Sequence, residues 1–185
     1  MKPSTKKFIL ILIASVAGIL LLIGLGIFIF LNTQFNVYED ARYKFSIKYP
    51  KTWKVVVRPN STAAVAFLRP KDTALDILQE NFSVTIQSMP DTVYSLAEFS
   101  DAIKRQMTGM FEKSINIIEY HPIHWGWRSG YKMVFRAPKP DHLWMSNAWL
   151  LRQDQAYIMA FLGDLNRYKQ DSLIVNEMIN SFRLK

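Results

Sequence analysis

Three histidines, His121, His124 and His142, are the side chains best suited to metal or acid–base chemistry. Neutral imidazole is a common metal ligand, so the close pair His121 and His124 is the first candidate for a metal site. Residues three apart on a regular strand point to opposite faces, so joint ligation requires Pro122 to bend the chain between them. We therefore expect no metal site, and a metal-dependent hydrolase remains a distant alternative.

Other catalytic motifs are missing from the sequence. Asp141 precedes His142, but no Gly-x-Ser-x-Gly motif supplies a nucleophile for a catalytic triad. Glycine-rich phosphate-binding loops are also absent. The chain has only seven glycines, and three of them lie in one apolar segment near the N-terminus. The chain has no cysteine, which excludes a disulfide framework and cysteine-ligated metals. We expect a protein that is not an enzyme and needs no cofactor.

Four tryptophans fall in the second half of the chain: Trp125, Trp127, Trp144 and Trp149. Trp125 and Trp127 are two residues apart, which predicts that they share one face of a strand, and the other two lie in the hairpin that follows. Aromatic side chains in strands usually belong to the core. The alternative is a ligand platform, in a pocket between these tryptophans and the helices.

Positive charge gathers between Asp40 and Asp72, where eight basic residues and no acidic residue occur. These side chains are either the solvated faces of strands or a surface that docks lipid head groups or a protein partner. The residues that we predict for docking are Arg42, Lys44, Lys48, Lys51, Lys54 and Arg58. No motif typical of nucleic-acid recognition accompanies them, so nucleic acid is not an expected partner.

These candidate sites must be positioned by a series of short strands. Strict alternation of apolar and polar residues predicts a strand over 43–49. Further extended segments are predicted at 53–57, 63–68, 81–89, 114–120, 123–127, 130–137, 142–151 and 155–162. The connections between neighbouring strands are too short for helical crossovers, which indicates antiparallel pairing.

Two helices complete the predicted domain. Ser95-Leu96-Ala97-Glu98 matches a capping box, and apolar residues continue from there at spacings of three and four. A closing helix is predicted from Asp164 or Asn166 through Arg183, with an apolar face formed by Leu173, Ile174, Met178, Ile179 and Phe182. Strands, helix, strands and helix in this order indicate an α+β domain, with a mainly antiparallel sheet covered by helices.

An uncharged segment of 24 residues, Phe8–Leu31, precedes the domain. As a helix it would be about 36 Å long, enough to cross a hydrocarbon core of about 30 Å. Its length, and the lack of a small-x-small motif after it, favour an uncleaved signal anchor over a cleaved signal peptide. Three lysines before the segment predict a cytoplasmic N-terminus.

The expected organisation is that of a single-pass membrane protein. It has a cytoplasmic tail at 1–7, a transmembrane signal anchor at 8–31, a linker at 32–39 and a domain outside the cytoplasm at 40–185.

Several short motifs of the domain resemble the PsbP-like family. They are Phe45–Trp53, Phe67–Pro70, Glu80–Val84, Ser95–Phe99, Gly130-Tyr131, Tyr157 with Phe161, and Met178–Phe182. Their order and spacing are similar to the family over nearly the whole domain, and the Tyr-Pro-x-x-Trp unit at 49–53 is the most distinctive. The resemblance implies an α/β/α sandwich around an antiparallel sheet. It also implies a binding, assembly or accessory role, because the family includes photosystem, DcrB-type envelope and Ran-binding members.

Together these features predict a non-enzymatic, membrane-anchored accessory protein that assists the assembly or stability of a membrane or envelope complex, with a photosystem among the candidates. Its expected partners are membrane lipids, through the N-terminal helix, and an unidentified protein complex. The alternative is an extracytoplasmic protein that binds a lipid or another small ligand between sheet and helix.

Overall fold

The computed structural model describes residues 12–23, 34–57, 63–71, 78–89, 95–110, 115–137 and 142–185. The chain divides into two compact units, Met1–Asn36 and Val37–Lys185. In the first unit, residues 12–23 form a helix. No helix within the described ranges combines the length and the apolar character that a membrane span requires. Residues 8–11 and 24–31 of the predicted anchor lie outside the described residues, so the anchor stays a prediction.

Ten strands in two sheets make up most of the described residues from Phe35 onward. The larger sheet comprises β3 (Lys54–Val57), β4 (Ala63–Leu68), β5 (Asn81–Ser88), β6 (Asn116–Trp125), β7 (Arg128–Ala137), β8 (Leu143–Arg152) and β9 (Gln155–Asp164). Their order is β3-β4-β5-β9-β8-β7-β6, and every neighbouring pair is antiparallel. The smaller sheet has the order β1-β2-β10 and comprises β1 (Phe35–Asp40), β2 (Phe45–Pro50) and β10 (Arg183–Leu184).

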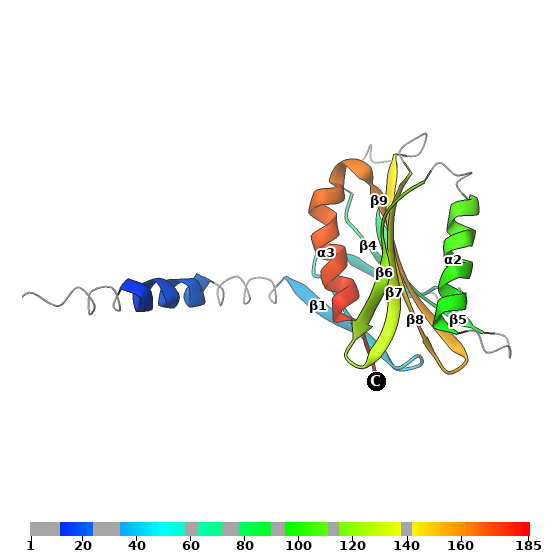
Figure 1. Cartoon of the computed structure of the whole chain (residues 1–185), viewed down its shortest axis with the longest axis horizontal. Coiled ribbons are helices and arrows are strands. Elements are labelled where there is room, and N and C mark those ends of the chain that lie inside the picture. Colours follow the sequence, from blue (N-terminus) through cyan, green and yellow to red (C-terminus); the bar gives the residue numbers. More distant parts are fainter. Residues whose placement is uncertain are drawn as a thin grey trace, which may run out of the picture. The chain divides into compact units, whose positions relative to one another are not determined.

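Two helices cover opposite faces of the larger sheet, as Figure 1 shows. They are α2 (Leu96–Met110) and α3 (Tyr168–Ser181), the latter preceded by the short 3₁₀ helix η1 (Leu165–Arg167). This arrangement confirms the predicted α+β class with a mainly antiparallel sheet.

Helix α2 begins at the predicted capping box. The Ser95 hydroxyl accepts a hydrogen bond from the Glu98 N–H at 3.2 Å, and the Glu98 carboxylate accepts one from the Ser95 N–H at 2.8 Å. Phe99 and Ile103 of the helix are buried in one cluster with Trp149 and its neighbours on the sheet. Full burial of such side chains contributes about 1.5–3 kcal/mol each, so this contact fixes α2 on its face of the sheet.

Helix α3 buries most of the apolar face predicted for it, since Met178, Ile179 and the following Phe182 are buried. Leu173 was expected to point inward, but it is 73% exposed. The buried apolar side chains within the helix are Val175, Met178 and Ile179, which follow the spacing of three and four that forms one stripe of a helix. Leu173 is two residues from Val175 and therefore lies off this stripe.

The segments predicted at 114–120 and 123–127 form the single strand β6. Pro122 lies within it, opposite Tyr131 of β7. Proline is tolerated in an edge strand, because one side of such a strand has no ladder to which an N–H must donate. The separation predicted at Pro122 is therefore wrong.

Two further strands have no counterpart in the sequence analysis. Strand β1 occupies most of the predicted linker 32–39, and its Tyr38 ring packs against Phe45 and Phe67, with centroids 6.0 and 5.8 Å away. Strand β10 has only two residues, which pair with Ser46 and Phe45 of β2. A two-residue strand is too short to show a pattern of its own.

A buried ionic cluster joins the end of β4 to α3. Nη1 of Arg69 lies 2.6 Å from Glu80 and 3.2 Å from Asp171, and the Asp171 side chain is 1% exposed. Burial and the neighbouring Glu80 raise the pKa of Asp171 to about 6, while Arg69 opposes the rise. The cluster ties the start of α3 to the sheet through charged groups.

Candidate functional site

The basic residues predicted for docking are divided between the two ends of β2. Arg42 and Lys44 are exposed in the turn that joins β1 to β2, whereas Lys51 and Lys54 are exposed beyond its other end. A strand of six residues is about 20 Å long, so the two pairs are separate surfaces.

The remaining two predicted docking residues belong to neither surface. Lys48, within β2, is half-buried, and its ammonium group forms a 3.5 Å salt bridge with Glu177 of α3. Arg58 lies outside the described residues.

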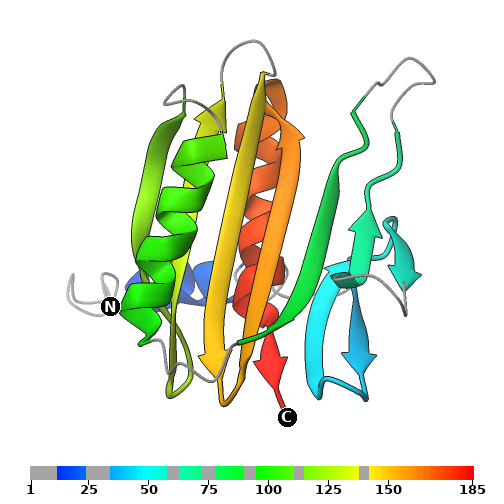
Figure 2. The same ribbon diagram turned by 90° about the vertical axis from the view of Figure 1, so that its right-hand side faces the viewer.

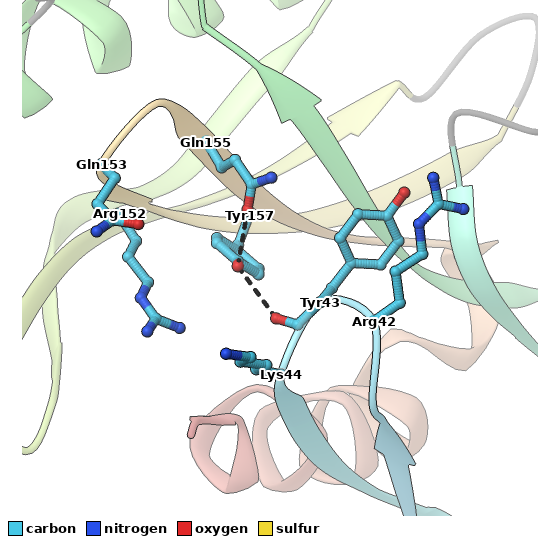
Figure 3. Close-up of a pocket in the computed structure, with 7 residues that line it drawn as sticks. All are labelled: Arg42, Tyr43, Lys44, Arg152, Gln153, Gln155 and Tyr157. Carbon is cyan, nitrogen blue, oxygen red and sulfur yellow. Dashed lines mark hydrogen bonds between the residues drawn. The ribbon is translucent and has the colours of Figure 1, made fainter.

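A pocket of about 200 Å³ opens where the β1–β2 turn meets the β8–β9 turn. Figure 3 shows the residues that line it, which are Arg42, Tyr43, Lys44, Arg152, Gln153, Gln155 and Tyr157. None of them is acidic. The cationic ends of Lys44 and Arg152 lie on one side of Tyr157 in this view. Arg42 instead lies beside Tyr43, with its guanidinium carbon 5.0 Å from the ring centroid.

Tyr157, on β9, holds the two sides of the pocket together. Its side chain is buried, and its hydroxyl donates to the Tyr43 carbonyl oxygen at 3.1 Å and lies 3.0 Å from Oε1 of Gln155. Burial raises the pKa of Tyr157 above its ordinary value, while Arg152 and Arg128 act to lower it. The hydroxyl therefore remains a donor at neutral pH.

The backbone of the pocket is held by Lys185, which follows β10. The Lys185 N–H donates to the Lys44 carbonyl at 2.8 Å, and the Arg152 guanidinium donates to the main-chain oxygen of Lys185 at 3.1 Å. Lys44 and Gln153 have φ angles of 53° and 55°, in the left-handed region that favours glycine. Such a conformation costs about 1 kcal/mol in a residue with a side chain.

No acidic side chain of the described residues forms a salt bridge with Arg42, Lys44 or Arg152, although Arg152 donates to the main-chain oxygen of Lys185. The nearby carboxylate of Asp40 accepts hydrogen bonds from the Tyr43 N–H and the Tyr38 hydroxyl instead.

An exposed aromatic side chain lies at the same end of the domain. Trp127 occupies the turn between β6 and β7, is 83% exposed, and has the Arg128 guanidinium carbon 4.0 Å from its ring centroid. In Figure 2 the turns after β1, β6 and β8 all lie at the lower end of the domain, with the turn after β8 between the other two. Exposed tryptophan and arginine are enriched in protein interfaces, so this end has the composition of a contact surface.

The other three tryptophans of the predicted ligand platform belong to the core and do not form one platform. Nε1 of Trp125 donates to the Ile179 carbonyl of α3 at 2.6 Å, whereas Nε1 of Trp149 donates to Ser100 of α2 at 2.8 Å. The rings of Trp125 and Trp149 therefore lie on opposite faces of the sheet. Trp144 is 1% exposed and packs on the α3 side, with its ring centroid 5.0 Å from that of Tyr168.

The side chains of His121 and His124 have different contacts and do not form a shared site. His121 and His124 lie on the continuous strand β6, where His121 contacts Glu119 and His124 contacts Ser129. Within the described ranges, no three His, Asp or Glu side chains gather closely enough to hold a metal ion.

A second hollow, the α2 groove, lies beside α2 and has a volume of about 190 Å³. It is lined by Asn81, Ser83, Met107, Met145, Asn147, Ala160, Phe161 and Leu162. Asn147 is 4% exposed, and its Nδ2 has no hydrogen-bond partner among the described residues.

Only part of the basic pocket could be predicted from the sequence. Arg42 and Lys44 were predicted to bind a partner, whereas Arg152, Gln153 and Tyr157 were not. The hairpin at Gln153 and its polar flanks were visible in the sequence. Its meeting with the β1–β2 turn was not, because the contact between Tyr157 and Tyr43 spans 114 residues.

Two helices on opposite faces of an antiparallel sheet, with a basic pocket at one end, define an α+β sandwich whose surface suits an anionic ligand. The chain belongs to the PsbP family, whose model matches residues 33–184. Comparison with curated proteins finds no significant match.

Solved structures share the fold at low sequence identity. Cyanobacterial PsbP (CyanoP) from Synechocystis sp. PCC 6803 has a TM-score of 0.63 and 13% identity, covering 82% of this chain and 93% of its own. The Ran-binding protein Mog1p of Saccharomyces cerevisiae has a TM-score of 0.55 and 9% identity, covering 81% and 95%. LpqN of Mycobacterium tuberculosis, involved in cell envelope biogenesis, has a TM-score of 0.55 and 8% identity, covering 82% and 91%. At these identities the likeness describes the fold alone.

Proposed function

We propose that this protein is a non-enzymatic accessory member of the PsbP family that binds a partner in a membrane or envelope complex. The observation that carries the proposal is that one end of the domain has both a basic pocket without acidic lining residues and the exposed Trp127. Cationic side chains steer an acidic partner toward the surface, and a central aromatic side chain supplies contact area once the partner has docked. Mog1p and LpqN, with the same fold, are associated with Ran and with the cell envelope respectively.

Membrane anchoring is part of the same proposal. Eighteen of the 24 residues in Phe8–Leu31 are Leu, Ile, Val or Phe, which supports insertion into a bilayer. The anchor would keep the domain outside the cytoplasm, close to membrane proteins. An alkaline wash of membranes that contain the full chain tests this step. Retention in the pellet is expected, and release into the wash contradicts the anchor.

The partner is tested by cross-linking at native expression, followed by capture of the full chain from detergent-solubilised membranes. We expect a complex of defined stoichiometry. The double variant Lys44→Glu, Arg152→Glu should lose it, whereas the matched control Lys51→Glu, Lys54→Glu, at the other end of β2, should retain it. Recovery of the monomer alone from the wild-type chain contradicts the proposal.

A second candidate function is the binding of a small amphiphile in the α2 groove. Its apolar lining, with Met107 and Met145, and the unpaired amide of Asn147 favour a ligand with an apolar tail and one acceptor group. The volume of about 190 Å³ lies below the roughly 300–1,000 Å³ of most small-molecule sites, which ranks this function second. Native mass spectrometry that detects no co-purified ligand counts against it.

A further inference from the structure

The basic pocket also suits a small anionic ligand, whether or not the protein partner proposed above binds there. Lys44 and Arg152 come from two different turns, and their cationic ends lie on the same side of Tyr157 (Figure 3). Neither forms a salt bridge within the described residues. Two positive charges that line one pocket repel each other, so an anion between them lowers the electrostatic energy of the site.

The size of the pocket limits what the anion can be. A volume of about 200 Å³ is smaller than most sites that enclose a whole small molecule, so it suits one charged group with the rest of the ligand outside. The amides of Gln153 and Gln155 add neutral donors and acceptors to the lining.

We propose that this pocket binds a phosphate group between Lys44 and Arg152. A guanidinium donates two parallel hydrogen bonds to a phosphate, and an ammonium adds a compact point charge. A phosphate monoester carries a charge of about −1.5 to −2 at neutral pH, which balances both cations, whereas a carboxylate balances only one. Arg42 adds a third positive charge to the lining.

The backbone supports a ligand role for Lys44. Its φ of 53° is disfavoured for a residue with a side chain, and glycine would adopt it freely. The strained conformation nonetheless places an ammonium group in the pocket. Strained residues of this kind cluster at ligand-binding sites.

The test is a titration of the full, ¹⁵N-labelled chain in neutral detergent with inorganic phosphate at pH 7.5 and constant ionic strength. We expect saturable NMR shifts at the amides of Lys44, Gln153 and Gln155, and none with acetate. Lys44→Gln and Arg152→Gln should each weaken binding at least tenfold. The matched control Lys54→Gln should bind as the wild type does.

Two further arms identify the source of the phosphate. Glycerol 3-phosphate that binds in detergent more tightly than inorganic phosphate does indicates a soluble phosphate ester. Binding that becomes tighter still in nanodiscs with phosphatidic acid, whose head group is a phosphate monoester, indicates a lipid head group. Both outcomes support the site. Equal affinity for acetate and phosphate, or wild-type affinity in Lys44→Gln, overturns it. Arg152 also donates to the main-chain oxygen of Lys185, so if Arg152→Gln unfolds, Lys44→Gln decides the result.

Discussion

The hydroxyl of Tyr157 donates a hydrogen bond to the carbonyl oxygen of Tyr43 over 3.1 Å, although the two residues are 114 positions apart. This bond joins strand β9 of the larger sheet to the β1–β2 turn that carries Lys44. The geometry of the basic pocket therefore depends on one long-range contact between a side chain and the backbone.

Tyr157→Phe should lower the free energy of unfolding by about 1 kcal/mol, because the Tyr43 carbonyl loses its donor while the ring stays packed. Urea unfolding followed by circular dichroism measures the change. Tyr43→Phe is the control: it keeps the carbonyl, and within the described residues its own hydroxyl has no hydrogen bond, so its change should be small. Equal losses in both variants would show that the bond is not the cause.

Lys44→Gly should stabilise the fold by about 1 kcal/mol, since glycine adopts a φ of 53° without strain. The same variant should lose affinity for phosphate, so stability and binding should change in opposite directions. Thermal unfolding and the phosphate titration together check this. Lys54→Gly, in strand β3, is the matched control and should destabilise by about 0.5–1 kcal/mol.

Trp125 and Trp127 are two residues apart but should respond differently to replacement by phenylalanine. Trp125→Phe removes the donor to the Ile179 carbonyl and some core volume, so we expect a loss of about 2 kcal/mol. Trp127→Phe should change stability by less than about 0.5 kcal/mol. Because Trp127 is 83% exposed, Trp127→Phe should also remove most of the tryptophan fluorescence that acrylamide can quench. A fold that tolerates both changes equally would contradict the burial of Trp125.

Asp171 should make stability depend on pH. Its folded-state pKa of about 6 lies above the ordinary 3.8, so between about pH 4 and 6 the folded chain binds more protons than the unfolded chain. The stability that this residue contributes is therefore full below that range and is lost as the pH rises through about 6. The loss amounts to about 3 kcal/mol at most. Urea midpoints of the wild type and Asp171→Asn from pH 4 to 7 should converge or cross as the pH rises, and a constant difference would refute this.

Gly130→Ala should destabilise the domain by at least about 2 kcal/mol. An added Cβ would collide with the backbone oxygen of Trp149 and the ring of Trp125, neither of which can move freely in the core. Gly109→Ala is the control, because nothing lies within 4 Å of its Cβ position and alanine favours a helix by up to about 1 kcal/mol. The two thermal midpoints should shift in opposite directions.

Local patterns in the sequence predicted the elements whose signals are local. The capping box at Ser95 places the start of α2 correctly, because both of its hydrogen bonds join residues three apart. The alternation around Phe45 and Ile47 identifies β2, since a half-buried strand exposes every second residue. The family resemblance, carried by short motifs in a fixed order, is confirmed over residues 33–184.

The sequence by itself determined the α+β class, most of the strands and the basic stretch that contains Lys44. Only the tertiary structure decided which basic residues act together. It separated Lys44 from Lys51 and Lys54 and placed it beside Arg152, and it divided the tryptophans between two faces of the sheet. The physical reason is that periodicity fixes the direction of a side chain within its own element, whereas a pocket between two turns depends on sheet order and on long-range bonds such as that from Tyr157 to Tyr43.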